Sequence, residues 1–187
     1  MAANNSFTPQ QHTPLSRPIN RFTFISGKTI AWLLVVMVVA ESVIVAMRYG
    51  LDIGSIALQE SITYLHASCF LLGAAYTLQQ DEHVRVDIFY RQFTPRHRAM
   101  VNALGCILLL LPTCGFIVWS SLDYVAQSWS VQEASADAGG LPGVYLLKTL
   151  IPVFAVLLGL QGIAQLTDDI RRAFQKNPAI NSLTTAK

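Results

Sequence analysis

Four long apolar stretches, separated by polar segments, organise this chain. They cover about residues 29–47, 61–78, 101–121 and 145–166, and each holds few charged side chains. A helix needs about 20 predominantly apolar residues to cross the hydrocarbon core of a bilayer. The pattern therefore predicts an all-α integral membrane protein with four transmembrane helices.

Polar segments at both ends set the predicted domain boundaries. We expect residues 1–28 to form a flexible cytoplasmic segment, residues 29–172 a four-helix membrane domain and residues 173–187 a flexible cytoplasmic tail. The first apolar stretch starts too late and is too long for an ordinary signal peptide. An uncleaved signal anchor is therefore predicted.

Composition and charge support this interpretation and add an orientation. Charged residues make up only 13% of the chain, against about 25% in soluble domains. Lys and Arg are frequent before the first stretch, between the second and third, and after the fourth, and they are sparse in the other two connections. The positive-inside rule then places both termini in the cytoplasm. The net charge of +2 reflects this orientation, so the expected surroundings are the lipid bilayer and no nucleic acid is expected as a partner.

The connections contain further helix signals. Apolar side chains recur at helical spacing within residues 86–93, which favours a short interfacial helix on the cytoplasmic membrane surface. Residues 53–57 indicate a second shallow turn on the outer side. Thr94 and Pro95 form an N-cap and first-turn proline for the third long helix.

Three charged residues lie in or beside the first two stretches. Glu41 is the only acid well inside the first stretch, and an unpaired charge there costs about 3 kcal/mol on insertion scales. It is either a proton or sodium site, or it makes a helix–helix hydrogen bond within the chain or to another subunit. Arg48 and Glu60 close the outer ends of the two stretches. We expect a structural ion pair between them, with a substrate site as the alternative.

The charged segment after the second stretch has two interpretations. His83 and Asp87 are four residues apart and Asp81 and Glu82 add oxygens, which would allow a metal site. The alternative is a hydrogen-bonded turn where a helix leaves the membrane. Bis-His haem ligation needs two imidazoles at one depth, and only His66 lies within a stretch. No cofactor is expected, and the absence of a nucleophile–base pattern or phosphate-binding glycine loop predicts that the chain is not an enzyme.

Small and polar residues within the stretches predict how the helices pack. Gly159 and Gly162 permit close approach, and Gln161 and Gln165 offer hydrogen bonds one turn apart. Pro112 and Pro152 each remove a backbone donor and predict irregularities in their helices, and the three cysteines are expected to be packing residues. Four short helices can hide only some of these polar groups among themselves. The remaining polar faces indicate a larger partner in the same membrane.

Several short motifs carry a resemblance to a known family. They are Gln59-Glu60, Gln80-Asp81-Glu82-His83-Val84-Arg85-Val86-Asp87, Glu133-Ala134-Ser135, Gly139-Gly140-Leu141-Pro142, and Lys148 with Pro152. From about Arg48 to Arg172 the chain resembles the small, DctQ-like membrane subunit of tripartite ATP-independent periplasmic (TRAP) transporters, in particular the mannitol, chloroaromatic or keto-acid subgroup.

This resemblance implies a function and partners. Small subunits of this family accompany a large membrane subunit, which carries the sodium and substrate sites, and a periplasmic substrate-binding protein. We therefore expect a non-catalytic scaffold subunit in the bacterial inner membrane that supports cation-coupled, sodium-driven uptake of a small organic solute. The residues expected to have structural or subunit-interface roles are Glu41, Arg48, Glu60, His83, Arg85, Asp87, Lys148 and Gln161.

The outer loop from about residue 123 to 143 has no Lys or Arg and contains Glu133 and Asp137. A helix there would place these two acids on one face, and Gly139 and Gly140 would end it. Two roles are open for this segment: it helps to dock the binding protein, or it is a solvated loop that only closes the helix bundle. For the whole chain, the alternatives are a membrane-anchor subunit of a redox complex and a stand-alone four-helix membrane sensor.

Overall fold

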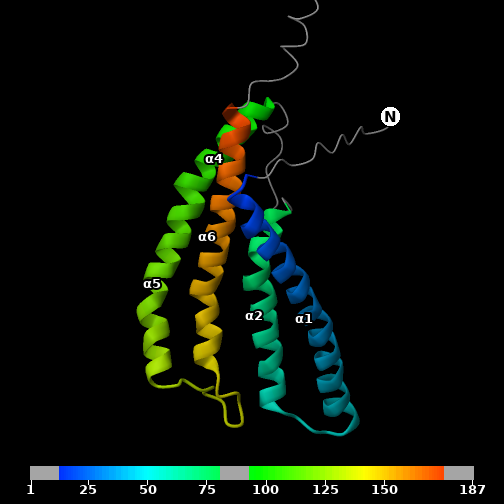
Figure 1. Ribbon diagram of the computed structural model, residues 1–187. Coiled ribbons are helices and arrows are strands. Elements are labelled where there is room, and N and C mark those ends of the chain that lie inside the picture. The colour runs from blue at the N-terminus through cyan, green and yellow to red at the C-terminus, as the bar shows by residue number, and fades with distance from the viewer. Residues whose placement is uncertain (1–12, 81–92, 175–187) are drawn as a thin grey trace, which may run out of the picture.

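The computed structural model describes residues 13–80 and 93–174, and its regular structure is helical (Figure 1). No strand occurs in these two ranges, so the predicted all-α class is confirmed for them. The elements are α1 (Ser16–Gly50), α2 (Ile56–Gln79), α4 (Pro95–Gly105), the π-helical turn η1 (Cys106–Leu110), α5 (Leu111–Ser130) and α6 (Val144–Phe174).

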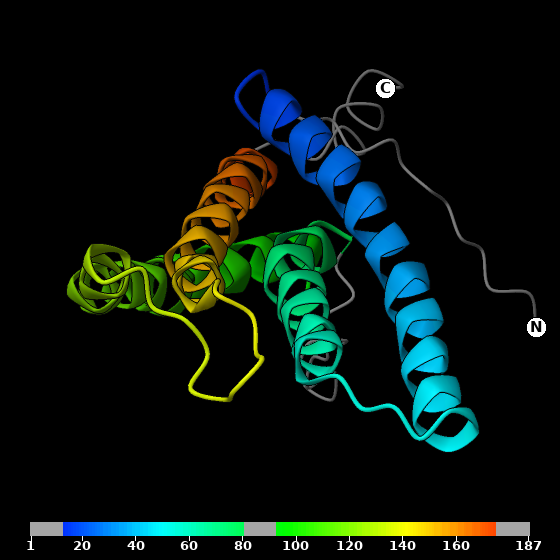
Figure 2. The ribbon, with the colours of Figure 1, turned by 90° about the horizontal axis from the view of Figure 1, so that it is seen from below.

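The helices spread into an open row, except where the C-terminal half of α6 lies against the first turns of α1 (Figure 2). Seen along the helices, the order is α5, α6, α2 and α1 (Figure 2). Helix α6 is the central element, because it contacts α1, α2, α4 and α5. The loops at residues 51–55 and 131–143 lie at one end of the row (Figure 1). We name this the outer end, after the predicted topology, and the opposite end the inner end.

Within residues 13–80 and 93–174, three helical segments are long and apolar enough to cross a membrane. They are α1, the continuous segment Arg96–Ser130, and α6. Helix α2 has 24 residues, about 36 Å at ~1.5 Å per residue, but Gln59, Glu60 and His66 lower its hydropathy and it is not among the three. The described residues therefore form a multi-pass helical membrane protein.

Helix α1 begins earlier than the sequence predicts. The predicted flexible segment extends to residue 28, whereas the structure is helical from Ser16. The polar residues of this segment suggested a solvated tail. In the structure Ser16 and Thr23 are buried on the face of α1 toward α6. Pro18 falls in the first turn, where its missing N–H has no intrahelical acceptor to lose. Residues 1–12 lie outside the described part of the chain.

The third long helix begins as predicted. The Thr94 hydroxyl accepts a hydrogen bond from the His97 N–H at 3.4 Å, and Pro95 occupies the first turn. The irregularity predicted at Pro112 takes the form of the π turn η1 immediately before it. The predicted outer turn at residues 53–57 is instead a loop that ends where α2 begins. The predicted interfacial helix at residues 86–93 falls almost entirely outside the described residues.

Small side chains make the close contacts between helices. The buried apolar side chains of the described residues are all small: Ala75, Ala99, Cys114, Ala155 and Ala164. Gly159 and Gly162 on α6 are buried as well, which confirms their predicted close approach. A Cβ at Gly159 would lie 3.6 Å from Cys114. A Cβ at Gly27 on α1 would overlap the Tyr76 ring of α2, so only glycine fits at this crossing. Large apolar side chains point outward, as in helices surrounded by lipid.

Candidate functional site

A carboxylate on α2 holds the outer loop. Glu60 accepts one hydrogen bond from the Ser135 hydroxyl and a second from the Leu141 N–H at 2.6 Å. The Ser135 N–H donates in turn to the Leu141 carbonyl at 3.1 Å. We call Glu60, Ser135, Gly140 and Leu141 the outer clasp. It joins three of the short motifs that carried the family resemblance.

The two glycines of the loop have separate structural reasons. Gly139 has a φ of +84°, which side chains rarely adopt. A Cβ at Gly140 would lie 2.5 Å from the Ser135 side chain and 2.7 Å from Glu60 Oε1. The glycine pair therefore allows the loop backbone to pass over the carboxylate. It does not end a helix, because residues 133–137 are not helical.

Lys148 attaches the beginning of the same loop to α6. Its ammonium group donates to the Glu133 carboxylate and lies 4.1 Å from the centroid of the Tyr124 ring. The hydrogen bond from Lys148 holds the pKa of Glu133 below its usual value. Glu133 and Asp137 thus do not share the predicted helical face. Glu133 is partly exposed and paired with Lys148 of the same chain, whereas Asp137 is exposed.

The predicted ion pair between Arg48 and Glu60 is wrong. No ion pair joins these two residues within the described part of the chain, and both oxygens of Glu60 are engaged by the outer loop. A backbone N–H is a fixed donor, while pairing a long exposed Arg side chain costs conformational entropy. Arg48 instead lines a groove between α1 and α2.

A buried amide connects α6 to α1 near the inner end. The Gln161 side chain is fully buried; it accepts a hydrogen bond from the Thr23 hydroxyl and donates to Asn20 Oδ1, each at 2.9 Å. The backbone carbonyl of Asn20 also accepts a hydrogen bond from the Gln79 side chain of α2 at 2.6 Å. The predicted helix–helix hydrogen bonding of Gln161 is therefore present within the chain.

Two further groups complete this inner polar layer, which comprises Asn20, Thr23, Gln161, Gln165 and Asp168. Gln165 donates to the Leu78 carbonyl at the end of α2 at 2.6 Å. Asp168 accepts from the Ser16 hydroxyl and the Thr13 N–H, both at 2.9 Å. A carboxylate at the start of a helix also interacts favourably with the helix dipole. Sequence reasoning missed the role of Asp168, because its partners lie more than 150 residues away.

Glu41 faces the groove that Arg48 also lines. The groove has a volume of about 540 Å³ and includes His66 of α2. Glu41 is exposed on α1, so a hydrogen bond to another subunit and an ion site both stay predictions for it.

The remaining predicted site residues, His83, Arg85 and Asp87, lie outside the described residues. In the two described ranges, no group of three or more His, Cys, Asp or Glu residues could hold a metal ion.

The fold and its polar clusters define a class of protein: a multi-pass membrane protein whose helices are joined at both ends by buried or loop-mediated hydrogen bonds. The family model of the DctQ component of tripartite ATP-independent periplasmic transporters matches residues 34–172. The chain belongs to this family, and is thus a small membrane subunit of a TRAP transporter. No curated protein and no solved structure matches the sequence.

Proposed function

We propose that this chain is the non-catalytic scaffold subunit of a sodium-coupled TRAP transporter in the bacterial inner membrane. It assembles with a large transport subunit and supports uptake of a small organic solute delivered by a periplasmic binding protein. Family membership over residues 34–172 carries the proposal. The resemblance of the outer-loop motifs supports a solute of the mannitol, chloroaromatic or keto-acid kind.

The exposed apolar surface agrees with a scaffold role. The most apolar part of α1 has none of its residues buried within the chain. Where the helices spread into a row they leave two broad faces, and lipid and a protein partner can each cover one of them (Figure 2). Such a layer widens a membrane assembly without enclosing a transport path of its own.

For the topology, we propose four spans with α2 as the least apolar and both termini in the cytoplasm. The common end of the loops at residues 51–55 and 131–143 supports this arrangement. A reporter fused after Ser135 should be periplasmic and one fused after Gln92 cytoplasmic. The reverse location for either fusion would overturn the topology without affecting the family assignment.

The outer loop is the proposed contact for the binding protein. Because the carboxylate of Glu133 is already paired with Lys148, the exposed carboxylate of Asp137 is the better candidate for a direct contact with the binding protein. Charge at such a contact chiefly changes the encounter rate. Asp137→Lys should then reduce uptake most at low binding-protein concentration, with a salt-dependent defect. Uptake equal to the parent at every concentration would favour a loop that only closes the outer end.

The charged segment around Asp87 is proposed to fix the inner turn for assembly. Asp87→Ala should lower the yield of the complex while the chain still inserts into the membrane.

Reconstitution tests the transport function directly. Proteoliposomes with the large subunit, this chain and the binding protein should accumulate solute when a sodium gradient is imposed. Omitting this chain should abolish uptake. Uptake without it would contradict the scaffold role, and a purified protein with a haem Soret band would favour the redox-anchor alternative.

A further inference from the structure

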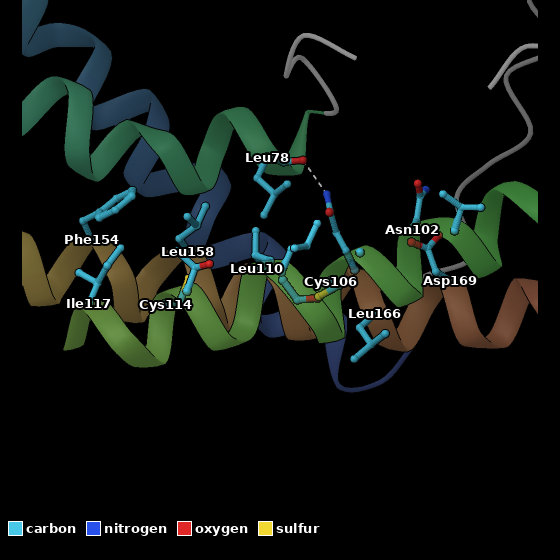
Figure 3. A pocket seen from close by; sticks show the side chains of 16 residues that line it. Leu78, Asn102, Cys106, Leu110, Cys114, Ile117, Phe154, Leu158, Leu166 and Asp169 are labelled. Carbon is cyan, nitrogen blue, oxygen red and sulfur yellow. Dashed lines mark hydrogen bonds between the residues drawn. The ribbon is translucent and has the colours of Figure 1, made fainter. Parts of the chain in front are cut away.

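A groove runs along α6 between two walls. One wall is the end of α2, and the other is formed by α4, η1 and α5. The groove has a volume of about 500 Å³, which lies within the range of about 300–1,000 Å³ typical of ligand pockets. Gln165 of the inner polar layer also lines the groove, and it donates a hydrogen bond from α6 to the Leu78 carbonyl of α2 (Figure 3).

The polarity of the groove changes along its length. At one end its lining is apolar and includes Ile117, Phe154 and Leu158 (Figure 3). At the inner end Asn102 and Asp169 line it (Figure 3). The Arg172 guanidinium, 3.6 Å from Asp169 and half exposed, adds a cation beside this end. Because Arg172 balances the charge of Asp169, a ligand that fits both ends is apolar along most of its length and polar at one end.

The length of the groove fits a lipid of one leaflet. From Phe154 to Asp169 the groove follows α6 for about 22 Å at ~1.5 Å per residue. One leaflet, including its headgroup region, is about 20–22 Å thick, half of the ~40–45 Å bilayer.

The π turn contributes directly to this wall. Cys106, Leu109 and Leu110 of η1 line the groove. The extra residue in a π turn widens the helix locally, and such turns occur frequently at functional sites.

We propose that this groove binds one acyl chain of an inner-leaflet phospholipid, with the polar ester groups at the Asn102–Asp169 end. The leaflet follows from the topology proposed above, whereas the binding itself requires only that the chain lies in a membrane. A lipid bound there would fill the space between α2 and α5, which both pack on α6 and have no extensive contact with each other. It would thereby act as a structural part of the subunit.

A photoreactive lipid tests the proposal. The full-length chain with its large subunit is reconstituted in vesicles of phosphatidylethanolamine and phosphatidylglycerol that contain a phospholipid with an acyl-chain diazirine. After irradiation, adducts should be concentrated in peptides around η1 and residues 154–166, above the background on the exposed face of α1. A diazirine near the chain terminus should label the Phe154 end, and one near the ester the Asn102 end. A reversed gradient, or groove labelling no higher than the α1 background, would overturn the proposal.

Variants with a filled groove provide the matched control. Leu158→Trp places a large ring in the groove, and its groove adducts should fall at least tenfold, a change that corresponds to about 1.4 kcal/mol in binding. Val156→Trp changes an exposed residue of α6 that does not line the groove, and its adducts should stay near the parent value. If Leu158→Trp does not assemble, Thr113→Phe fills the groove from the opposite wall. Undiminished adducts in an assembled groove-filling variant would show that the lipid binds elsewhere.

Discussion

The outer and inner ends of this protein are held together in different ways. At the outer end, charged side chains of the helices, Glu60 and Lys148, bind a loop. At the inner end, buried side chains join the helices directly: Gln161 binds Thr23, and the carboxylate of Asp168 binds Ser16. Loss of the outer contacts should therefore free the loop without separating the helices. Loss of the inner contacts, or of the nearby α1–α2 crossing, should disturb the packing of the helices themselves.

The largest effect is expected at the crossing of α1 and α2. Gly27→Leu forces a side chain into the Tyr76 ring, and overpacking costs about 1–3 kcal/mol, occasionally more. The purified variant should show a lower melting temperature in detergent and a low yield of complex. Gly73→Leu on α2 is the matched control, because a Cβ there meets nothing within 4 Å. Equal melting temperatures for the two variants would contradict the close crossing.

A smaller loss of stability is expected from Gln161→Leu. The variant keeps the approximate shape but leaves the Thr23 hydroxyl and the Asn20 amide without this partner. A hydrogen bond between membrane helices is worth about 0.6 kcal/mol on average, so two of them should contribute about 1 kcal/mol. Unfolding in a denaturing detergent titration measures the change. Gln127→Leu, on an exposed position of α5, should leave the midpoint unchanged.

At the outer end the expected effect is local. Gly140→Ala places a methyl group against Ser135 and Glu60, which should open the clasp and increase hydrogen exchange of residues 131–143. The melting temperature should change less than in Gly27→Leu. Gly54→Ala, in the other outer loop, adds a methyl group into open space and serves as the control. Exchange as slow as in the parent would mean that the clasp does not hold this loop.

The smallest expected effect depends on pH. Because the pKa of Glu133 is lowered in the folded protein from an ordinary value of 4.5, its pairing with Lys148 stabilises the loop above that value and is lost as the pH falls below it. A spin label on Ala138→Cys should become more mobile on this acidification. In Lys148→Met the label should already be mobile at neutral pH and respond less to acid. Arg48→Met should behave like the parent, because Arg48 makes no hydrogen bond or ion pair with residues 131–143 in the described structure.

Local signals in the sequence predicted some of these features and not others. The N-cap at Thr94 depends on neighbouring residues, so the sequence contains all that determines it. The close approach at Gly159 was also predictable, since small residues in a membrane helix have few other uses. The partners of Glu60 could not be predicted, because Ser135 lies 75 residues away in the sequence. Arg48 is the opposite charge that lies nearer to Glu60 in the sequence. The early start of α1 was missed because polar residues that bind α6 have the same composition as a solvated tail.

Association with the large subunit tests the central claim most directly. The tagged chain, expressed from its native operon and purified in mild detergent, should elute together with one multispan partner in a fixed ratio, as identified by mass spectrometry. Gly27→Leu should reduce the amount of that partner, whereas Gly140→Ala should retain it. Elution of the folded parent chain without any multispan protein would contradict a scaffold role.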